Sequence, residues 1–138
     1  MIVDSSALLC VLFRGEGHED MLRRMLDDPG PAVGAPTLAE TGIVLEARLG
    51  TSARGLLERF LDEVGVQEIP FGELHWREAV DAYRRYGKGR HAAALNYGDC
   101  MTYAVAALAG EPLLFSGDDF TKTDLTPARP SPGSDDPT

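Results

Sequence analysis

The sequence predicts an α/β fold with a central, mostly parallel sheet of four or five short strands. Short apolar runs alternate along the chain with longer segments of helical periodicity, which is typical of strands joined by helices. Acidic residues recur where a predicted strand ends or a predicted helix begins, the edge at which open parallel sheets bind their ligands. The strands are predicted at residues 1–4, 32–35, 66–71 and 113–115. The helices are predicted at residues 5–14, 18–27, 38–49, 51–64, 73–86 and 97–109.

The N-terminal part of the chain supplies a strand, two helices and a second strand. The first strand is a β-branched run that ends at Asp4, and Ser5 and Ser6 are able to cap a helix that continues to about Arg14. Glycines separate this helix from an amphipathic helix over residues 18–27. A Pro-Gly-Pro turn then leads into the second strand.

Two helices and a third strand form the middle of the chain. Pro36 and Thr37 open the first of these helices, and Gly50 ends it as a C-cap. Thr51 and Ser52 start the next helix, whose apolar residues keep helical register. The third strand is weak at its end because a proline there cannot donate a hydrogen bond to the sheet.

The C-terminal half contains two helices, a loop and the last strand. The helix over residues 73–86 has apolar and aromatic residues that we expect to face inward, namely Leu74, Ala79, Ala82, Tyr83 and Tyr86. A polar, glycine-containing loop over residues 87–96 precedes the next helix, and a Gly-Glu-Pro turn leads to the last strand. Residues 117–120 follow as a turn or short helix.

The composition fits one ordinary globular domain. At 138 residues the chain is long enough to bury a core without disulfides or a structural metal. We assign residues 1–126 to this domain and expect the Pro-, Ser- and Asp-rich residues 127–138 to be disordered. No apolar run reaches the ~18 residues that a membrane-spanning helix needs, and the two cysteines and three histidines lack zinc-site spacing. We therefore expect a reduced, cytoplasmic protein.

The net charge of −9 requires an explanation if nucleic acid is the substrate. Proteins that bind nucleic acid by neutralising phosphates are basic somewhere on their surface. An acidic excess is explained by carboxylates clustered around a divalent cation, because a hard metal ion prefers oxygen ligands. The alternative is a solvated acidic surface that keeps the protein soluble.

Acidic residues occupy four places that the predicted fold brings to one edge of the sheet. Asp4 ends the first strand, Glu40 lies in the first turn of the helix after the second strand, and Asp99 lies in the first turn of the helix over residues 97–109. Asp118 and Asp119 follow the last strand. These acids would repel one another unless a cation such as Mg²⁺ or Mn²⁺ were bound among them.

Each of these acids also has a structural interpretation. Glu40 completes a capping-box pattern with Thr37, Asp99 lies where the helix macrodipole favours negative charge, and the pair after the last strand suits an ordinary turn. Asp4 is the exception, since an acid at the end of a buried strand is costly without a partner. The coincidence of all four positions at the ligand edge favours a metal site.

Five segments carry a pattern that extends along almost the whole chain. They are Ile2-Val3-Asp4-Ser5-Ser6-Ala7-Leu8, Leu38-Ala39-Glu40-Thr41, Tyr86-Gly87-Lys88-Gly89-Arg90-His91, Leu95-Asn96-Tyr97-Gly98-Asp99-Cys100, and residues 112–120 followed by Thr123-Asp124. In this order and spacing, the chain resembles the PIN-domain family and, within it, the VapC toxins. The resemblance implies a three-layer α/β/α domain and a Mg²⁺- or Mn²⁺-dependent endoribonuclease, the toxin component of a type II toxin–antitoxin system.

The resemblance also assigns roles to the acidic residues. Asp4, Glu40 and Asp99 match metal-site acids of the family. The fourth acid is Asp118, directly after the last core strand, with Asp119 as the alternative.

Supporting roles and partners follow from the same resemblance. Ser5 stands where relatives often have threonine, and either hydroxyl is able to bind a metal-bound water; we also assign a supporting role to Asn96. The family further implies toxin homodimers and a small VapB-type antitoxin that masks the site. Such antitoxins insert a basic or aromatic tail into the acidic groove, for which a charge of −9 is favourable.

A basic segment before the second glycine-containing loop is predicted to hold RNA. Its basic residues are Arg84, Arg85, Lys88 and Arg90. Tyr83 and Tyr86 are interleaved with them, and aromatic rings are able to stack on bases. The alternative is a solvated helix end whose arginines bind the terminal carbonyls.

The predicted reaction is hydrolysis of an RNA phosphodiester by a metal-activated water, oriented by Ser5 or Asp119, which leaves a 5′-phosphate and a 3′-hydroxyl. One rival is a phosphohydrolase with Asp4 as covalent nucleophile, but such enzymes usually need an acid two residues later, where this chain has Ser6. The second rival is a catalytically inactive PIN-like module that binds RNA or the antitoxin, although all four acidic positions are filled.

Overall fold

A parallel four-stranded sheet forms the centre of the computed structural model, which describes residues 1–128. The strands lie in the order β3-β2-β1-β4, and each neighbouring pair is parallel. Their bounds are β1 (Ile2–Val3), β2 (Ala32–Gly34), β3 (Gln67–Ile69) and β4 (Leu113–Leu114). The prediction of a mostly parallel sheet of short strands is therefore confirmed. Residues 129–138, most of the tail predicted to be disordered, lie outside the described residues.

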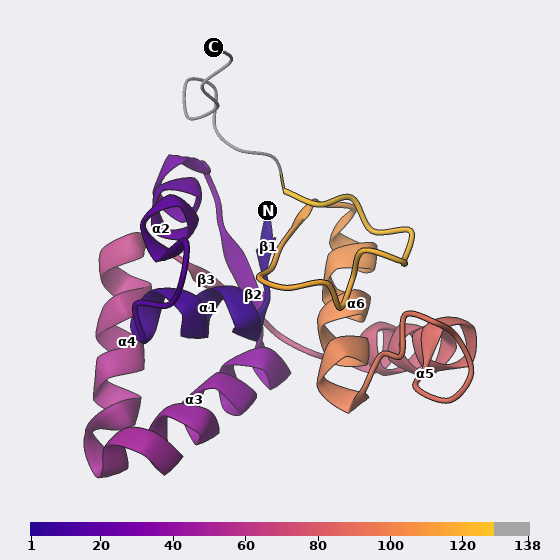
Figure 1. The fold of residues 1–138 in the computed structure, drawn as a ribbon, viewed down its shortest axis with the longest axis horizontal. Helices are drawn as coiled ribbons and strands as arrows, with labels where there is room; N and C mark the ends of the chain where they lie inside the picture. The colour runs from indigo at the N-terminus through magenta and orange to yellow at the C-terminus, as the bar shows by residue number, and fades with distance from the viewer. Residues whose placement is uncertain (129–138) are drawn as a thin grey trace.

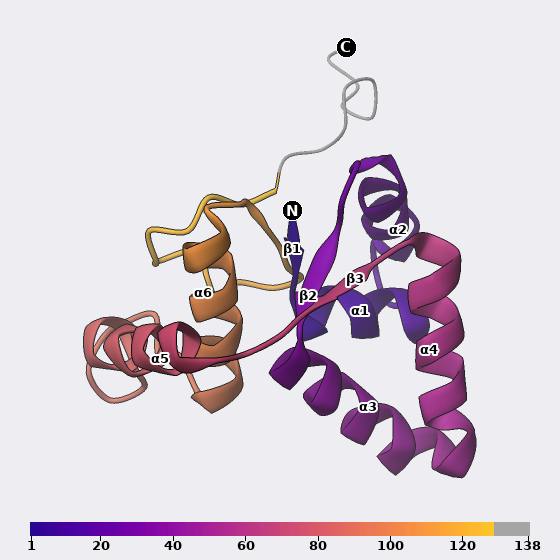
Figure 2. The ribbon, with the colours of Figure 1, turned by 180° about the vertical axis from the view of Figure 1, so that it is seen from behind.

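Six α-helices and one 3-10 turn connect and follow the strands in the described part of the chain. They are α1 (Ser5–Leu12), α2 (His18–Asp27), α3 (Ala35–Leu49), η1 (Gly50–Ser52), α4 (Ala53–Val64), α5 (Glu73–Tyr86) and α6 (Tyr97–Ala109). In Figure 1, α5 and α6 lie to one side of the strands and α1, α2 and α4 to the other, and Figure 2 shows the same division from behind. Within residues 1–128, no helix combines the length and the apolar character needed to cross a membrane.

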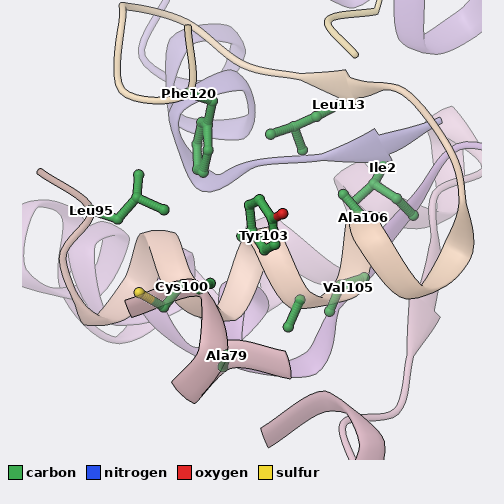
Figure 3. Packing of buried hydrophobic residues seen from close by; sticks show 11 residues of the cluster. Ile2, Ala79, Leu95, Cys100, Tyr103, Val105, Ala106, Leu113 and Phe120 are labelled. Atoms are coloured by element: carbon green, nitrogen blue, oxygen red, sulfur yellow. The ribbon is translucent and has the colours of Figure 1, made fainter. Parts of the chain in front are cut away.

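The two residues of β1 enter separate cores, because successive side chains of a strand point to opposite faces. Ile2 belongs to the core formed with α5 and α6, which includes Tyr103 and Phe120 (Figure 3). Val3 belongs to the core formed with α1, α2 and Val33 of β2. The sheet therefore lies between two helical layers, and the predicted three-layer arrangement is confirmed.

Helix α3 begins at Ala35, earlier than the predicted start at Leu38. Pro36 lies in its first turn, where the missing N–H would have had no partner within the helix. Gly34 before it allows a close approach of β2 to α6, since a Cβ at position 34 would lie 2.7 Å from Cγ2 of Val105. The end of β2 therefore passes directly into the helix.

Helix α5 buries fewer residues than the sequence predicts. Ala79 and Ala82 are buried in the core shared with α6, and Tyr86 packs against it. Leu74 is 70% exposed and Tyr83 is 45% exposed, so the prediction that these two face inward is wrong. The small alanine side chains form the face that meets α6, and the larger residues lie outside that contact.

The chain leaves the sheet after β4 and then returns to it. We call residues 115–126 the return loop. The N–H of Leu113 donates to the carbonyl of Thr126 (2.9 Å), and the carbonyl of Leu113 accepts from the N–H of Ala128 (2.8 Å). Pro127 and Ala128, which the sequence prediction placed in the tail, therefore lie beside β4.

Candidate active site

Asp4 lies at the end of β1 and is only 5% exposed. It is the N-cap of α1, and its Oδ2 accepts hydrogen bonds from the N–H (3.1 Å) and the hydroxyl (2.6 Å) of Ser6. The expectation that Ser5 or Ser6 caps this helix is wrong, because the aspartate itself is the cap. Ser6 also accepts a hydrogen bond from the N–H of Ser116 (3.0 Å), so it joins the carboxylate to the chain that follows β4.

A chain of buried hydroxyl groups supports the other oxygen of Asp4. The hydroxyl of Thr102 on α6 donates to Oδ1 (2.8 Å), and its oxygen lies 3.0 Å from the hydroxyl of Thr37 on α3. Sequence reasoning missed Ser6, Thr37 and Thr102. One signal was available, because Thr102 lies three residues after Asp99 and such residues share a helix face.

Glu40 lies in the second turn of α3 and is exposed. The expected position in the first turn is wrong, and the capping-box interpretation fails with it, because the N-cap is Gly34 and no side chain caps the helix. A Cβ at position 98 would lie 2.8 Å from Oε2 of Glu40 and 3.0 Å from Oε1. The carboxylate therefore lies against the first turn of α6, where Gly98 makes room for it.

Asp99 and Asn96 form a reciprocal capping box at the start of α6. The N–H of Asp99 donates to Oδ1 of Asn96 (2.8 Å), and the N–H of Asn96 donates to Oδ2 of Asp99 (3.0 Å). Burial raises the pKa of the Asp99 carboxyl to about 6, and repulsion from Asp119, Asp4 and Glu40 adds to the rise. The structural interpretation of Asp99 is thus correct, and it coexists with a strong acidic environment.

The structure brings Asp4, Glu40, Asp99 and Asp119 to one edge of the sheet, as the repulsion acting on Asp99 shows. With their side chains as they stand, no three Asp, Glu, His or Cys residues in 1–128 form a group that could hold a metal ion. The reason lies in their hydrogen bonds, because the oxygens of Asp4 are turned to Ser6 and Thr102 and Oδ2 of Asp99 is turned to a backbone N–H.

Asp118 and Asp119 are both exposed on the return loop, but their surroundings differ. Asp119 is among the groups whose charge raises the pKa of Asp99, and Asp118 is not. The backbone carbonyl of Asp118 accepts hydrogen bonds from the N–H (3.1 Å) and hydroxyl (2.8 Å) of Thr121, which fixes a tight turn in the loop. The loop geometry thus directs Asp119 toward α6.

The predicted RNA-binding residues do not form one uniform surface. Arg85 donates to Oδ2 of Asp124 (3.1 Å) and to the hydroxyl of Tyr103 (3.2 Å), so its guanidinium is engaged within the protein. Arg84 is paired with Asp81 on the exposed side of α5. Two further basic residues are exposed on the loop after α5, namely Lys88 and Arg90.

A sequence model of the PIN domain matches residues 1–125. Ribonuclease VapC36 of Mycobacterium tuberculosis is 46% identical over 126 residues, an alignment that covers 91% of this chain and 91% of that protein.

Solved structures with the same fold include two toxins. VapC20 of Mycobacterium tuberculosis, described as a sarcin-ricin loop cleaving toxin, superposes with a TM-score of 0.75 at 19% identity and covers 94% of this chain and 98% of that chain. A chain of a toxin–antitoxin complex from Klebsiella pneumoniae superposes with a TM-score of 0.65 at 17% identity and covers 89% of this chain and 92% of that chain.

Proposed function

The chain belongs to the PIN-domain family, and on that premise we propose that it is a divalent-metal-dependent endoribonuclease, the toxin of a toxin–antitoxin pair. The observation that carries the proposal is the assembly of four carboxylates at the carboxyl edge of the sheet, where one of them already has a raised pKa because of the others and of burial. The ribonuclease activity of a relative with 46% identity along nearly the whole chain supports the same function.

The residues at this edge fit a bound Mg²⁺ or Mn²⁺. Such ions take carboxylate oxygens as ligands, and a positive charge would relieve the repulsion among Asp4, Glu40, Asp99 and Asp119. When bound, the ion would activate water and stabilise the charge that develops on a phosphodiester. We assign the fourth position to Asp119, although the sequence pattern favours Asp118, because only Asp119 is among the charges that act on Asp99.

Residues of the chain orient these carboxylates. Ser6 and Thr102 hold the two oxygens of Asp4 in place, and Asn96 holds Asp99 at the helix N-terminus. Asp99 retains its proton below about pH 6. Because a protonated carboxyl is a poor ligand for a cation, we expect cleavage to increase as the pH rises through 6.

RNA contact is the role we propose for Lys88 and Arg90, with Arg84 beside them. The guanidinium of Arg90 lies 5.4 Å from the centre of the Tyr83 ring, which is 45% exposed. A cation next to an exposed aromatic face is suited to a phosphate and an adjacent base. We exclude Arg85 from this role because the return loop and α6 already engage it.

A VapB-type antitoxin and a second copy of the chain are the partners we propose. The net charge of −9 favours an antitoxin segment that carries basic residues, and the Klebsiella relative was solved as a toxin–antitoxin complex. Several large apolar side chains are available for protein contacts. The most exposed are Ile43 (69%), Leu74 (70%) and Tyr97 (80%).

Cleavage of total bacterial RNA by the purified protein, free of antitoxin, tests the proposal. The reaction contains Mg²⁺ or Mn²⁺, with EDTA as the control, and the Asp99→Asn, Asp118→Asn and Asp119→Asn variants are compared in parallel. We expect discrete fragments with 5′-phosphate ends, which disappear with EDTA, with Asp99→Asn and with Asp119→Asn. Intact RNA with both metals, from folded protein, would instead support the inactive binding module, and 2′,3′-cyclic phosphate ends would contradict the hydrolytic mechanism.

A further inference from the structure

We propose that Asp124 is a positioning residue, which sets the register of the return loop on α6 and thereby places Asp119 against Asp99. This inference rests on the proposed function, because the loop carries the fourth acid of the proposed metal site. It follows from three features of the loop: how its ends are held, what holds Asp124, and which face of α6 it meets.

The two ends of the return loop are attached to the sheet, and its tip is not. Before the loop, the N–H of Asp4 donates to the carbonyl of Leu114 (2.9 Å), and after it the carbonyl of Thr126 accepts from Leu113 (2.9 Å). Phe120 is buried at 1% exposure and its ring lies 5.5 Å from that of Phe115. Apolar burial is non-directional, so Phe120 holds the loop down without fixing where it lies along α6.

Asp124 supplies the directional contact. Its Oδ1 accepts from the hydroxyl of Tyr103 on α6 (2.5 Å), and its Oδ2 accepts from Nη2 of Arg85 on α5 (3.1 Å). Arg85 also donates to Tyr103 (3.2 Å) and to the hydroxyl of Tyr86 (2.9 Å). Both oxygens of one carboxylate are therefore fixed by groups on two different helices.

The loop meets one face of α6 at two points. Asp99 and Tyr103 are four residues apart on the helix, and residues at this spacing lie one above the other on the same face. Asp119 acts on the first of them and Asp124 binds the second. With the second point fixed, the loop has one position along the helix at which Asp119 reaches Asp99.

The contribution of this contact to stability is small, which favours a positioning role. The side chains of Arg85 and Asp124 are 48% and 56% exposed, and exposed ion pairs contribute little to folding. A contact that engages four side chains and adds little stability is explained by the geometry it imposes on the loop.

The test is a double-mutant cycle on Mn²⁺ binding, measured by calorimetry on the full chain without RNA. Asp124→Asn keeps the size of the side chain but places an amide against Arg85 or Tyr103. Because outer-shell residues typically change metal affinity by about 10–100-fold, we expect Asp124→Asn to weaken Mn²⁺ binding by about tenfold. In an Asp119→Asn background the same change should have no further effect, because the residue it positions is gone.

Arg77→Gln is the matched control, since Arg77 is an exposed arginine of α5 paired with Glu73 and distant from the loop; it should leave Mn²⁺ affinity unchanged. Tyr103→Phe, which removes only the hydroxyl that binds Asp124, is the second variant if Asp124→Asn does not fold. Unchanged Mn²⁺ affinity in both variants, or equal effects of Asp124→Asn with and without Asp119, would overturn the positioning role while leaving the proposed function intact. Failure of Asp119→Asn itself to weaken Mn²⁺ binding would overturn the assignment of the fourth ligand and this inference together.

Discussion

Replacement of Asp99 by asparagine should stabilise the metal-free protein at neutral pH while it abolishes cleavage. The carboxyl group is half-buried and its charge is repelled by three other acids, so the folded state carries a free-energy cost whenever Asp99 is ionised. Asparagine has nearly the same shape, retains an oxygen that can accept from the N–H of Asn96, and carries no charge.

The size of the effect follows from the pKa. A rise from 3.8 in the unfolded chain to about 6 in the folded protein corresponds to about 3 kcal/mol, at about 1.4 kcal/mol for each tenfold change in proton affinity. Partial exposure of the site to solvent reduces this figure, and we expect a gain of about 1–2 kcal/mol in the free energy of unfolding at pH 7.5.

The pH dependence has a definite sign. Because the pKa is raised on folding, the folded state binds more protons than the unfolded state between pH 3.8 and about 6, and the stability of the parent protein therefore falls as the pH rises through this window. The gain from Asp99→Asn should be largest above pH 6 and should mostly disappear near pH 4.5.

Urea unfolding in EDTA at pH 7.5 and pH 4.5 measures this difference for parent and variant. Comparison of the two proteins at each pH cancels the titration of the other carboxylates. A variant that is less stable than the parent at pH 7.5, or a gap that is the same at both pH values, would refute the electrostatic account of Asp99.

Three further substitutions test other contacts of the site. Gly98→Ala places a Cβ 2.8 Å from Oε2 of Glu40, and because a carboxylate at the end of a flexible side chain can move, we expect a folded protein by circular dichroism whose RNA cleavage is at least tenfold slower. Thr102→Val removes the donor to Oδ1 of buried Asp4 and should lower the free energy of unfolding in urea by about 1–3 kcal/mol. Gly34→Ala crowds β2 against α6 and should cost about 1–3 kcal/mol in the same assay.

Most of the fold could be predicted from the sequence because its signals are local. Alternation of short apolar runs with helical periodicity gave the order of strands and helices, and glycines marked the ends of α3 and α6. The start of α3 was missed because proline in a first turn resembles proline in a preceding loop. The exposure of Leu74 was missed because periodicity indicates which residues share a face, and the neighbour that meets that face is set by the tertiary structure.

The site could be predicted only in part. Its acids occupy strand ends and helix starts, which sequence shows directly. Their supports do not: Thr102 reaches Asp4 from α6, and nothing local indicates that contact. Arg85 is the clearest case, because a basic residue beside a glycine-containing loop suggests RNA contact, whereas its partner Asp124 is distant in sequence and close in space.

The position of β1 between β2 and β4 has a consequence for how the protein is made. Ile2 pairs with Leu113, so the first strand to emerge from the ribosome must wait for the last before the sheet can close. Contacts between such distant parts of a chain form late, because a long loop must close before they contribute. Asp4 and Asp119 therefore come together only near the end of synthesis, and a nascent chain that still lacks its final strand cannot carry an assembled nuclease site.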